Sequence, residues 1–306
     1  MIGYVLRRLM QMLMTLIGIS IITFLITHLL PADPARQIAG RTASAAQVEQ
    51  VRHQFGLDLP LPQQYLRYAA NLAQGDLGRS YVQRTDVSSL IAARLPATLL
   101  LMLGAIFCEL LIGLTAGTIA AFRRNTSFDQ GVMIGALLFV STPQFLVAYT
   151  LLYVFSNWLG WFPLSGYGSF RHLVLPSIAL GLLGGGWYGR MMRSSIIEVL
   201  RQDYVRTARA KGLSRARIVL VHVLPNGLLP IIAMIGLDIG YFMSGIVVVE
   251  SVFGWPGIGQ LAWQAIQTID IPIIMGVTLV AACAIVLGNL LADLMAPLID
   301  PRIKLK

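Results

Sequence analysis

Three acidic residues stand inside stretches that are otherwise apolar, and their type and position make them candidates for chemistry. Glu109, Asp238 and Asp293 each lie within a long run of hydrophobic residues. A carboxylate within a bilayer is costly, so such residues usually line an ion or substrate path or carry protons. Glu109 and Asp238 are therefore candidates for a translocation path.

The same carboxylates admit other interpretations. They can pair with another subunit, or with Arg190, which stands near a predicted helix end. Asp293 is close to the end of its apolar run, so we expect its side chain to reach the membrane boundary.

Other kinds of chemistry lack the residues they need. A phosphate-binding loop requires Gly-Lys-Ser/Thr, and none of the three lysines, Lys211, Lys304 and Lys306, follows a glycine. Cys108 and Cys283 lie in apolar segments, where free cysteines behave as small packing residues. We expect no catalytic residue, cofactor or metal site, and any energy from ATP must come from another subunit.

The composition places the chain among membrane proteins. Hydrophobic residues make up 56% of it and charged residues only 12%, against about 25% charged in soluble domains. Six stretches are long and apolar enough to cross a bilayer as helices. They cover residues 9–30, 97–122, 132–158, 173–192, 225–249 and 272–296.

The basic residues predict the orientation of these helices. If the N-terminus is cytoplasmic, 15 of the 23 lysines and arginines lie inside, as the positive-inside rule requires. The net charge of +9 is then explained without nucleic acid. The first apolar run exceeds a signal-peptide core, and no cleavage pattern follows it. We therefore expect a retained first helix and two cytoplasmic termini.

The segment between the first two predicted spans has helical signals of its own. Ser44 and Gln47 match a capping box, and Gly56 suits a helix stop. Pro62 can open a second short helix that ends near Gly75. A small helical element is therefore expected on the outer face, either as a lid that packs on the bundle or as a docking surface.

Glycines at four-residue spacing predict close helix packing in the membrane, without indicating the partner helix. They are Gly181, Gly185 and Gly189, the pair Gly113 and Gly117, and the pair Gly236 and Gly240.

The stretch DYVRTARAKGLSRARIVLVHVLP, residues 203–225, places five basic side chains between two apolar segments. Upstream and within it, five residues recur at helical spacing and predict one helix face: Ile196, Ile197, Leu200, Tyr204 and Ala208. Gly212 can end that helix in the left-handed conformation, and Ser214 can cap the next. The result is a protruding knob suited to be gripped by another protein. The alternative is a basic loop drawn to anionic lipid, at about 1 kcal/mol per charge.

The loop resembles the "EAA" loop of bacterial ABC-importer permeases, whose pattern is Glu-Ala-Ala, three residues, Gly, nine residues, Ile-x-Leu-Pro. Here Arg206-Thr207-Ala208 takes the first places, Gly212 is in register, and His222-Val223-Leu224-Pro225 closes the pattern. The changes of Glu to Arg and Ile to His match the peptide, nickel and opine branch, the dipeptide-permease B-type subunits. Four further stretches are similar to that branch: RRLMQMLMTLIGISIITFLITHLLPADP, GDLGRSY, VVVESVFGWPGIG and LIDPRIK.

The resemblance implies an all-α membrane protein with six transmembrane helices, the type I ABC-importer permease fold. Residues 1–30 would form the first helix, 31–94 a small helical periplasmic segment, and 95–306 the core domain with a coupling loop at 194–224. The protein would be a multi-pass component of the bacterial inner membrane, in contact with lipid, importing small peptides or a related ligand such as glutathione, a nickel chelate or an opine.

The resemblance also implies partners: a related second permease subunit, two cytoplasmic ATPases and a periplasmic or lipid-anchored binding protein. ATP hydrolysis would move the bundle through the loop by alternating access. Ala208 and Gly212 would allow close approach to the ATPase, and Arg206, Arg209 and Lys211 would offer polar contacts. The full set of expected coupling residues is Asp203, Tyr204, Arg206, Thr207, Ala208, Arg209, Lys211, Gly212, Leu213 and Arg215.

Two rival hypotheses come from other classes. A secondary transporter driven by protons through Glu109 and Asp238 would be self-sufficient, and would carry broken helices and internal repeats. A membrane-anchored scaffold would move no ligand. The secondary transporter leaves the loop at residues 203–217 unexplained.

Overall fold

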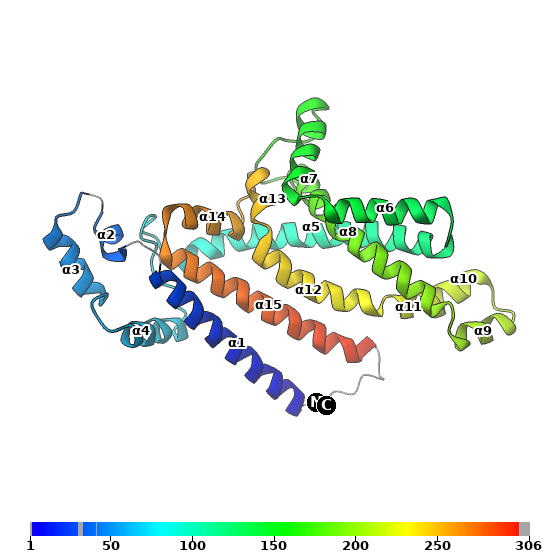
Figure 1. Cartoon of the computed structure of the whole chain (residues 1–306), viewed down its shortest axis with the longest axis horizontal. Coiled ribbons are helices and arrows are strands. Elements are labelled where there is room, and N and C mark those ends of the chain that lie inside the picture. Colours follow the sequence, from blue (N-terminus) through cyan, green and yellow to red (C-terminus); the bar gives the residue numbers. More distant parts are fainter. Residues whose placement is uncertain (1, 30–32, 41, 300–306) are drawn as a thin grey trace. The chain divides into compact units, whose positions relative to one another are not determined.

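The computed structural model describes residues 2–29, 33–40 and 42–299, and in these ranges it contains helices and no strand beyond an isolated bridge between Arg79 and Asp86 (Figure 1). The chain forms two compact units. The first comprises Met1–Thr98 with Pro256–Val286, and the second comprises Leu99–Trp255 with Leu287–Lys306.

The first unit combines a long N-terminal helix with short helices. It contains α1 (Ile2–Leu29), α2 (Pro34–Ala39), α3 (Ala45–Phe55), α4 (Leu61–Ala73), α14 (Ile258–Thr268), the start of α5 (Val87–Phe122) and most of α15 (Ile271–Ile299). The predicted capping box is present, with Gln47 N–H donating to Ser44 Oγ over 3.3 Å and Ser44 N–H donating to Gln47 Oε1 over 2.8 Å. Gly56 ends α3 in the left-handed conformation, as predicted.

The helix α4 packs on the long helices of its own unit through aromatic side chains. Phe24 of α1 meets the rings of Tyr65 and Tyr68 at centroid distances of 5.5 and 6.0 Å. Ile271 and Met275 of α15 complete this cluster. Within this unit the short helices therefore form a layer held to α1 and α15.

The second unit is built around α8 (Phe170–Val199). The remaining helices are the rest of α5, α6 (Ser127–Ser141), α7 (Gln144–Leu151) with its π-helical extension Leu152–Trp158, α9 (Asp203–Ala210), α10 (Arg215–Arg217), the π-helical segment Ile218–Val223, α11 (Leu224–Gly227), α12 (Leu229–Gly245) and α13 (Val247–Val252). Figure 1 shows α6 running along α8. Tyr188, Met192 and Ile196 of α8 are almost fully buried in the core of this unit.

A partly buried ion pair ties α6 to α8. Asp129, in the first turn of α6, is 3% exposed, and its carboxylate accepts two hydrogen bonds from the Arg193 guanidinium, at 2.5 and 2.7 Å. The backbone N–H of Asn125 donates to the same carboxylate over 2.9 Å. Nothing in the sequence patterns above singled out this pair.

The glycine stripes mark the contact between α5 and α8. A Cβ atom on Gly113 would overlap Tyr188, and one on Gly117 would overlap the Gly189 carbonyl oxygen. The prediction of close packing is confirmed for these residues, and the partner helices are now known. Gly181 meets Cys108 in the same way, and Gly236 meets Gly288 of α15.

We expect Gly117→Ala to lower the free energy of unfolding by roughly 1–3 kcal/mol, because the added methyl group forces two backbones apart. The measurement is thermal unfolding of the purified protein in detergent. Gly131→Ala in α6 is the matched control, since its Cβ would meet nothing within 4 Å. Equal behaviour of the two variants would contradict the observed α5–α8 contact.

Within the described residues, three of the six predicted spans correspond to helices long and apolar enough to cross a membrane, and up to five do if bent helix pairs are counted. Three are single helices, with candidate spans Leu6–Thr27, Val87–Phe122 and Ile271–Leu290. Two more arise only if a bent helix pair counts as one span. The sixth, 173–192, lies in α8, whose 30 residues reach about 45 Å, but whose glycines and arginines lower its hydropathy.

The predicted spans at 132–158 and 225–249 are interrupted helices. The first is broken into α6 and α7, bent by 104°, and the second is bent by 41° between Gly227 and Leu229. At the first break Thr142 is extended, with ψ of 131°, because a residue that precedes proline is disfavoured in the helical region. Pro143 then opens α7 at a new angle.

Candidate functional site

The predicted break in the basic loop is present. The helix α9 ends at Ala210, and Gly212 adopts φ of +72°, so that Leu213 N–H donates to the Ala208 carbonyl over 3.3 Å. Ser214 caps α10 by accepting a hydrogen bond from Arg217 N–H. Figure 1 shows α9 and α10 together at the end of α8 within their unit.

One continuous helix face from Ile196 to Ala208 was expected, and this expectation is wrong. The helix α8 ends at Val199, and α9 starts anew at Asp203. The interruption shifts the register, so that Val205 is buried and Tyr204 is 41% exposed. Ala208 is also buried against the chain's own core. It therefore orients α9 from within, and it is not available for the close approach to a partner that the resemblance implied.

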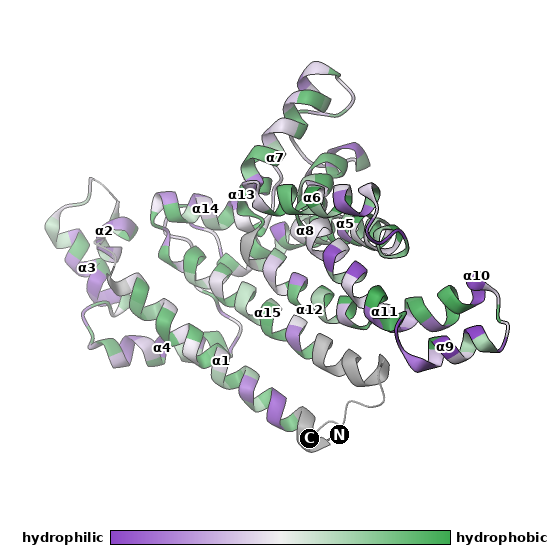
Figure 2. Cartoon of the chain, turned by 45° about the vertical axis from the view of Figure 1, so that its right-hand side comes forward, coloured by the Kyte–Doolittle hydropathy of each residue, from purple (hydrophilic) through white to green (hydrophobic). Residues whose placement is uncertain are grey.

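The basic side chains of the loop point outward. Arg206, Arg209, Lys211, Arg215 and Arg217 are all exposed. Arg206 lies 4.0 Å from Asp203, with both side chains open to solvent, which is a weak interaction. Figure 2 shows hydrophilic residues gathered on α9 and α10, next to helices that are largely hydrophobic. The loop is thus a positively charged surface on a short helix whose inner side, at Val205 and Ala208, is buried.

The two acids predicted for the translocation path are brought together. Glu109 of α5 and Asp238 of α12 line one cavity of about 460 Å³, here called the α8 cavity, and their carboxyl groups interact. The Tyr188 hydroxyl, from α8, donates a hydrogen bond to Asp238 Oδ2. Tyr188 was missed at the sequence level because a tyrosine in an apolar helix carries no signal of its own.

The alternative of a pair with Arg190 is not what the structure shows. The Arg190 guanidinium lies over the Trp187 ring, 4.5 Å from its centroid. Glu109 instead occupies the space that Gly184 leaves open, because a Cβ atom there would overlap its carboxyl group. The side chain of Asp293 lies outside the described residues, as do Lys304 and Lys306.

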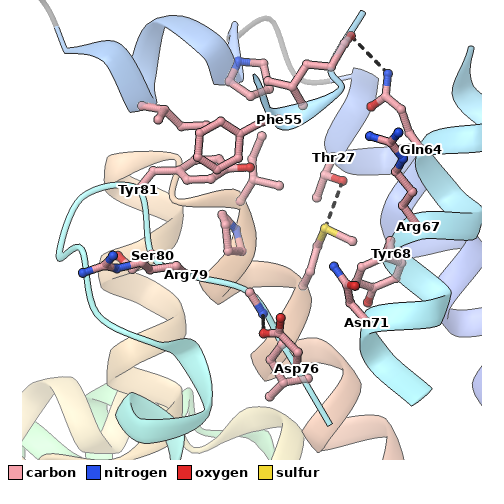
Figure 3. Close-up of a pocket in the computed structure, with 18 of the residues that line it drawn as sticks. Thr27, Phe55, Gln64, Arg67, Tyr68, Asn71, Asp76, Arg79, Ser80 and Tyr81 are labelled. Atoms are coloured by element: carbon pink, nitrogen blue, oxygen red, sulfur yellow. Dashed lines mark hydrogen bonds between the residues drawn. The ribbon is translucent and has the colours of Figure 1, made fainter. Parts of the chain in front are cut away.

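A second cavity, of about 850 Å³, lies in the first unit and is here called the α4 cavity. Figure 3 shows Arg67, Tyr68 and Asn71 of α4 on one side of it and Tyr81 on the other. Burial, and secondarily the charge of Asp270, raises the pKa of Tyr81 to about 12, so its phenol stays neutral.

The loop that forms one wall of the α4 cavity is held by Asp270. This carboxylate is 1% exposed, and it accepts hydrogen bonds from Ser80 Oγ at 2.5 Å and from the N–H groups of Tyr81 and Val82 at 3.2 and 3.1 Å. The last two residues of the GDLGRSY motif, Ser80 and Tyr81, are therefore held in place by hydrogen bonds to Asp270. Sequence similarity alone did not explain this role of the motif.

The chain belongs to the family of binding-protein-dependent transport system inner membrane components. The family model matches residues 113–305, and the model of its N-terminal part matches residues 1–102. Among curated relatives, the glutathione transport system permease protein GsiC of Escherichia coli strain CFT073 is 42% identical over 306 residues, covering 100% of both chains. GsiC of E. coli strain K12 is 41% identical over the same length and coverage.

Among solved structures, two crystal forms of the inward-facing MetNI methionine ABC transporter are similar, with TM-scores of 0.56 and 0.57. Each is 18% identical and covers 69% of this chain and 96% of that chain. This likeness confirms the predicted ABC-importer permease fold. The protein is a multi-pass inner-membrane transport component and not an enzyme.

The comparisons also decide against the secondary transporter. Broken helices, which that hypothesis predicted, are present in α6–α7 and before α12. They therefore do not separate the two classes of transporter, whereas membership of the ABC permease family does.

Proposed function

We propose that this chain is a permease subunit of an ATP-driven importer of glutathione. The observation that supports glutathione as the substrate is the identity of 41–42% with glutathione permeases over the full length of both chains. The distribution of lysines and arginines supports cytoplasmic termini, which places the basic loop inside and the α4 cavity in the periplasm.

The basic loop is the proposed contact with the ATPase subunits. Arg206, Arg209 and Lys211 are exposed on a helix whose position is fixed from beneath by Val205 and Ala208. A rigid, charged helix of this kind transmits force better than a flexible loop attracted to lipid would. The proposed contact set is the one predicted above, with Ala208 acting through packing.

The α8 cavity is the proposed translocation path. It opens between Trp187, Leu237 and Tyr241, which are 56–63% exposed. We place the related second permease subunit against this face, so that the path runs between the two subunits. A binding protein would deliver glutathione from the periplasm, and alternating access would release it inside.

The test uses a strain that lacks this chain and its complemented derivative. We expect uptake of radiolabelled glutathione to require the chain, and a mild-detergent pull-down to recover a second permease and P-loop ATPases. Glutathione uptake that does not depend on the chain, with chain-dependent uptake of a labelled dipeptide, would assign a peptide substrate instead. Recovery of the chain alone, with transport in vesicles lacking ATP, would overturn the assembly.

A further inference from the structure

The α8 cavity contains two carboxyl groups without a cationic partner. Among the described residues that line it, none is lysine, arginine or histidine. Glu109 and Asp238 come from different helices, separated by more than a hundred positions in the sequence. Their meeting at one cavity is therefore a product of the fold and not of a local acidic run.

Of the two acids, Glu109 gives the stronger indication that the cavity binds a hydrogen-bond donor. Its side chain is 3% exposed, and its Oε2 atom has no hydrogen-bond partner among the described atoms. A buried carboxyl oxygen without a donor is costly, and such groups are normally satisfied by a partner, water or a ligand. Gly184 keeps the space beside it free of side-chain atoms.

Asp238 is oriented by its neighbour. The Tyr188 hydroxyl donates to Oδ2, and the Asp238 carboxyl also meets that of Glu109. Tyr188 is itself 1% exposed, so this hydrogen bond is buried on the protein side. Thr142 and Gln144, at the break between α6 and α7, add polar groups to the same lining.

We propose that Glu109 and Asp238, with Tyr188 positioning Asp238, bind the primary ammonium group of the transported solute. A metal ion fits less well, because Ca²⁺ takes about 6–8 oxygen ligands and the described residues hold no group of three His, Cys, Asp or Glu suited to a metal. An ammonium donates three hydrogen bonds, and the Tyr241 ring at the cavity can also face a cation. The inference rests on the proposed function for the identity of the solute.

The first test needs no knowledge of that solute. Cys108 and Cys283 are replaced by alanine and Gln144 by cysteine, in the purified assembly with its partner subunits. The rates of thiol modification by 2-aminoethyl and 2-sulfonatoethyl methanethiosulfonate are then compared. The measured quantity is the rate with the cationic reagent divided by the rate with the anionic one. We expect this ratio to be about tenfold higher at the introduced cysteine than at a free thiol in solution. Glu109→Gln should remove most of that difference. Glu49→Gln, on exposed α3, is the matched control. A ratio that Glu109→Gln leaves unchanged would overturn the proposal.

The second test measures kcat/KM for uptake of glutathione and of N-acetylglutathione. We expect Glu109→Gln to reduce the value for glutathione about tenfold and that for the acetylated form less than about twofold. For each solute the loss is the ratio of kcat/KM in the unsubstituted protein to that in the variant. Any preference of the binding protein affects both members of such a ratio equally, so it cancels when the losses for the two solutes are compared. An equal loss for both solutes would assign Glu109 a structural role and overturn the inference. Failure of the unsubstituted assembly to import glutathione would instead refute the proposed substrate, and the thiol reaction would still decide the ammonium site.

Discussion

Replacing Asp129 with alanine is expected to lower the free energy of unfolding by about 3 kcal/mol, because it leaves the partly buried Arg193 guanidinium without its partner. The carboxylate also accepts from Asn125 N–H, so one change removes three hydrogen bonds between or beside α6 and α8. For a chain of this size we expect the midpoint of thermal unfolding in detergent to fall by about 10 °C.

The double variant Asp129→Ala with Arg193→Met separates the interaction energy of the ion pair from the contributions of the two single side chains. We expect it to lose less than the sum of the two single changes, because no unpaired charge remains. The exposed pair of Glu49 and Arg52, 3.3 Å apart, provides the control, and Glu49→Ala should lower stability by less than about 1 kcal/mol. Additive losses for Asp129 and Arg193 would mean that the two side chains do not stabilise each other.

Gly212→Val is expected to abolish glutathione uptake while the protein still reaches the membrane. At φ of +72° a β-branched side chain is strongly disfavoured, so the break between α9 and α10 cannot keep its shape. The measurement is uptake by cells, with the amount of the chain in the membrane determined by immunoblot and the ATPase rate of the purified assembly.

Gly212→Asn distinguishes backbone shape from contact. Asparagine tolerates the left-handed conformation, and no atom lies within 4 Å of the added Cβ in this chain. We expect it to retain most of the uptake if the shape of the break is what matters. Equal loss in both variants would indicate that an ATPase surface lies directly on Gly212, and normal uptake by Gly212→Val would remove the loop from the coupling role.

The sequence predicted best those features that depend on neighbouring residues. The capping box at Ser44, the left-handed Gly56 and the break at Gly212 each follow from a few adjacent side chains, and all are present. The break at Pro143 was predictable from the same kind of signal. The continuous hydropathy of residues 132–158 conceals it.

The features that the sequence did not predict depend on tertiary contacts. The spacing of Gly117 predicted a close helix contact, but it did not predict that Gly189 is the residue on the other side of it. The sequence indicated the acids Glu109 and Asp238, but not the Tyr188 hydroxyl that donates to Asp238. The register of α9 could not be read from spacing, because the turn after Val199 moved Val205 into the position expected for Tyr204.

The length of α8 has a mechanical consequence. Tyr188 forms part of the cavity wall, and Val199 lies about 16 Å further along the helix axis, packed with Ile196 against Val205 and Ala208 of α9. Under the proposed coupling role of α9, a displacement of α9 would tilt the continuous helix α8 about its other end, near Pro176. Tyr188 lies about halfway between Pro176 and Val199 along the axis, so the cavity wall would move about half as far as the loop.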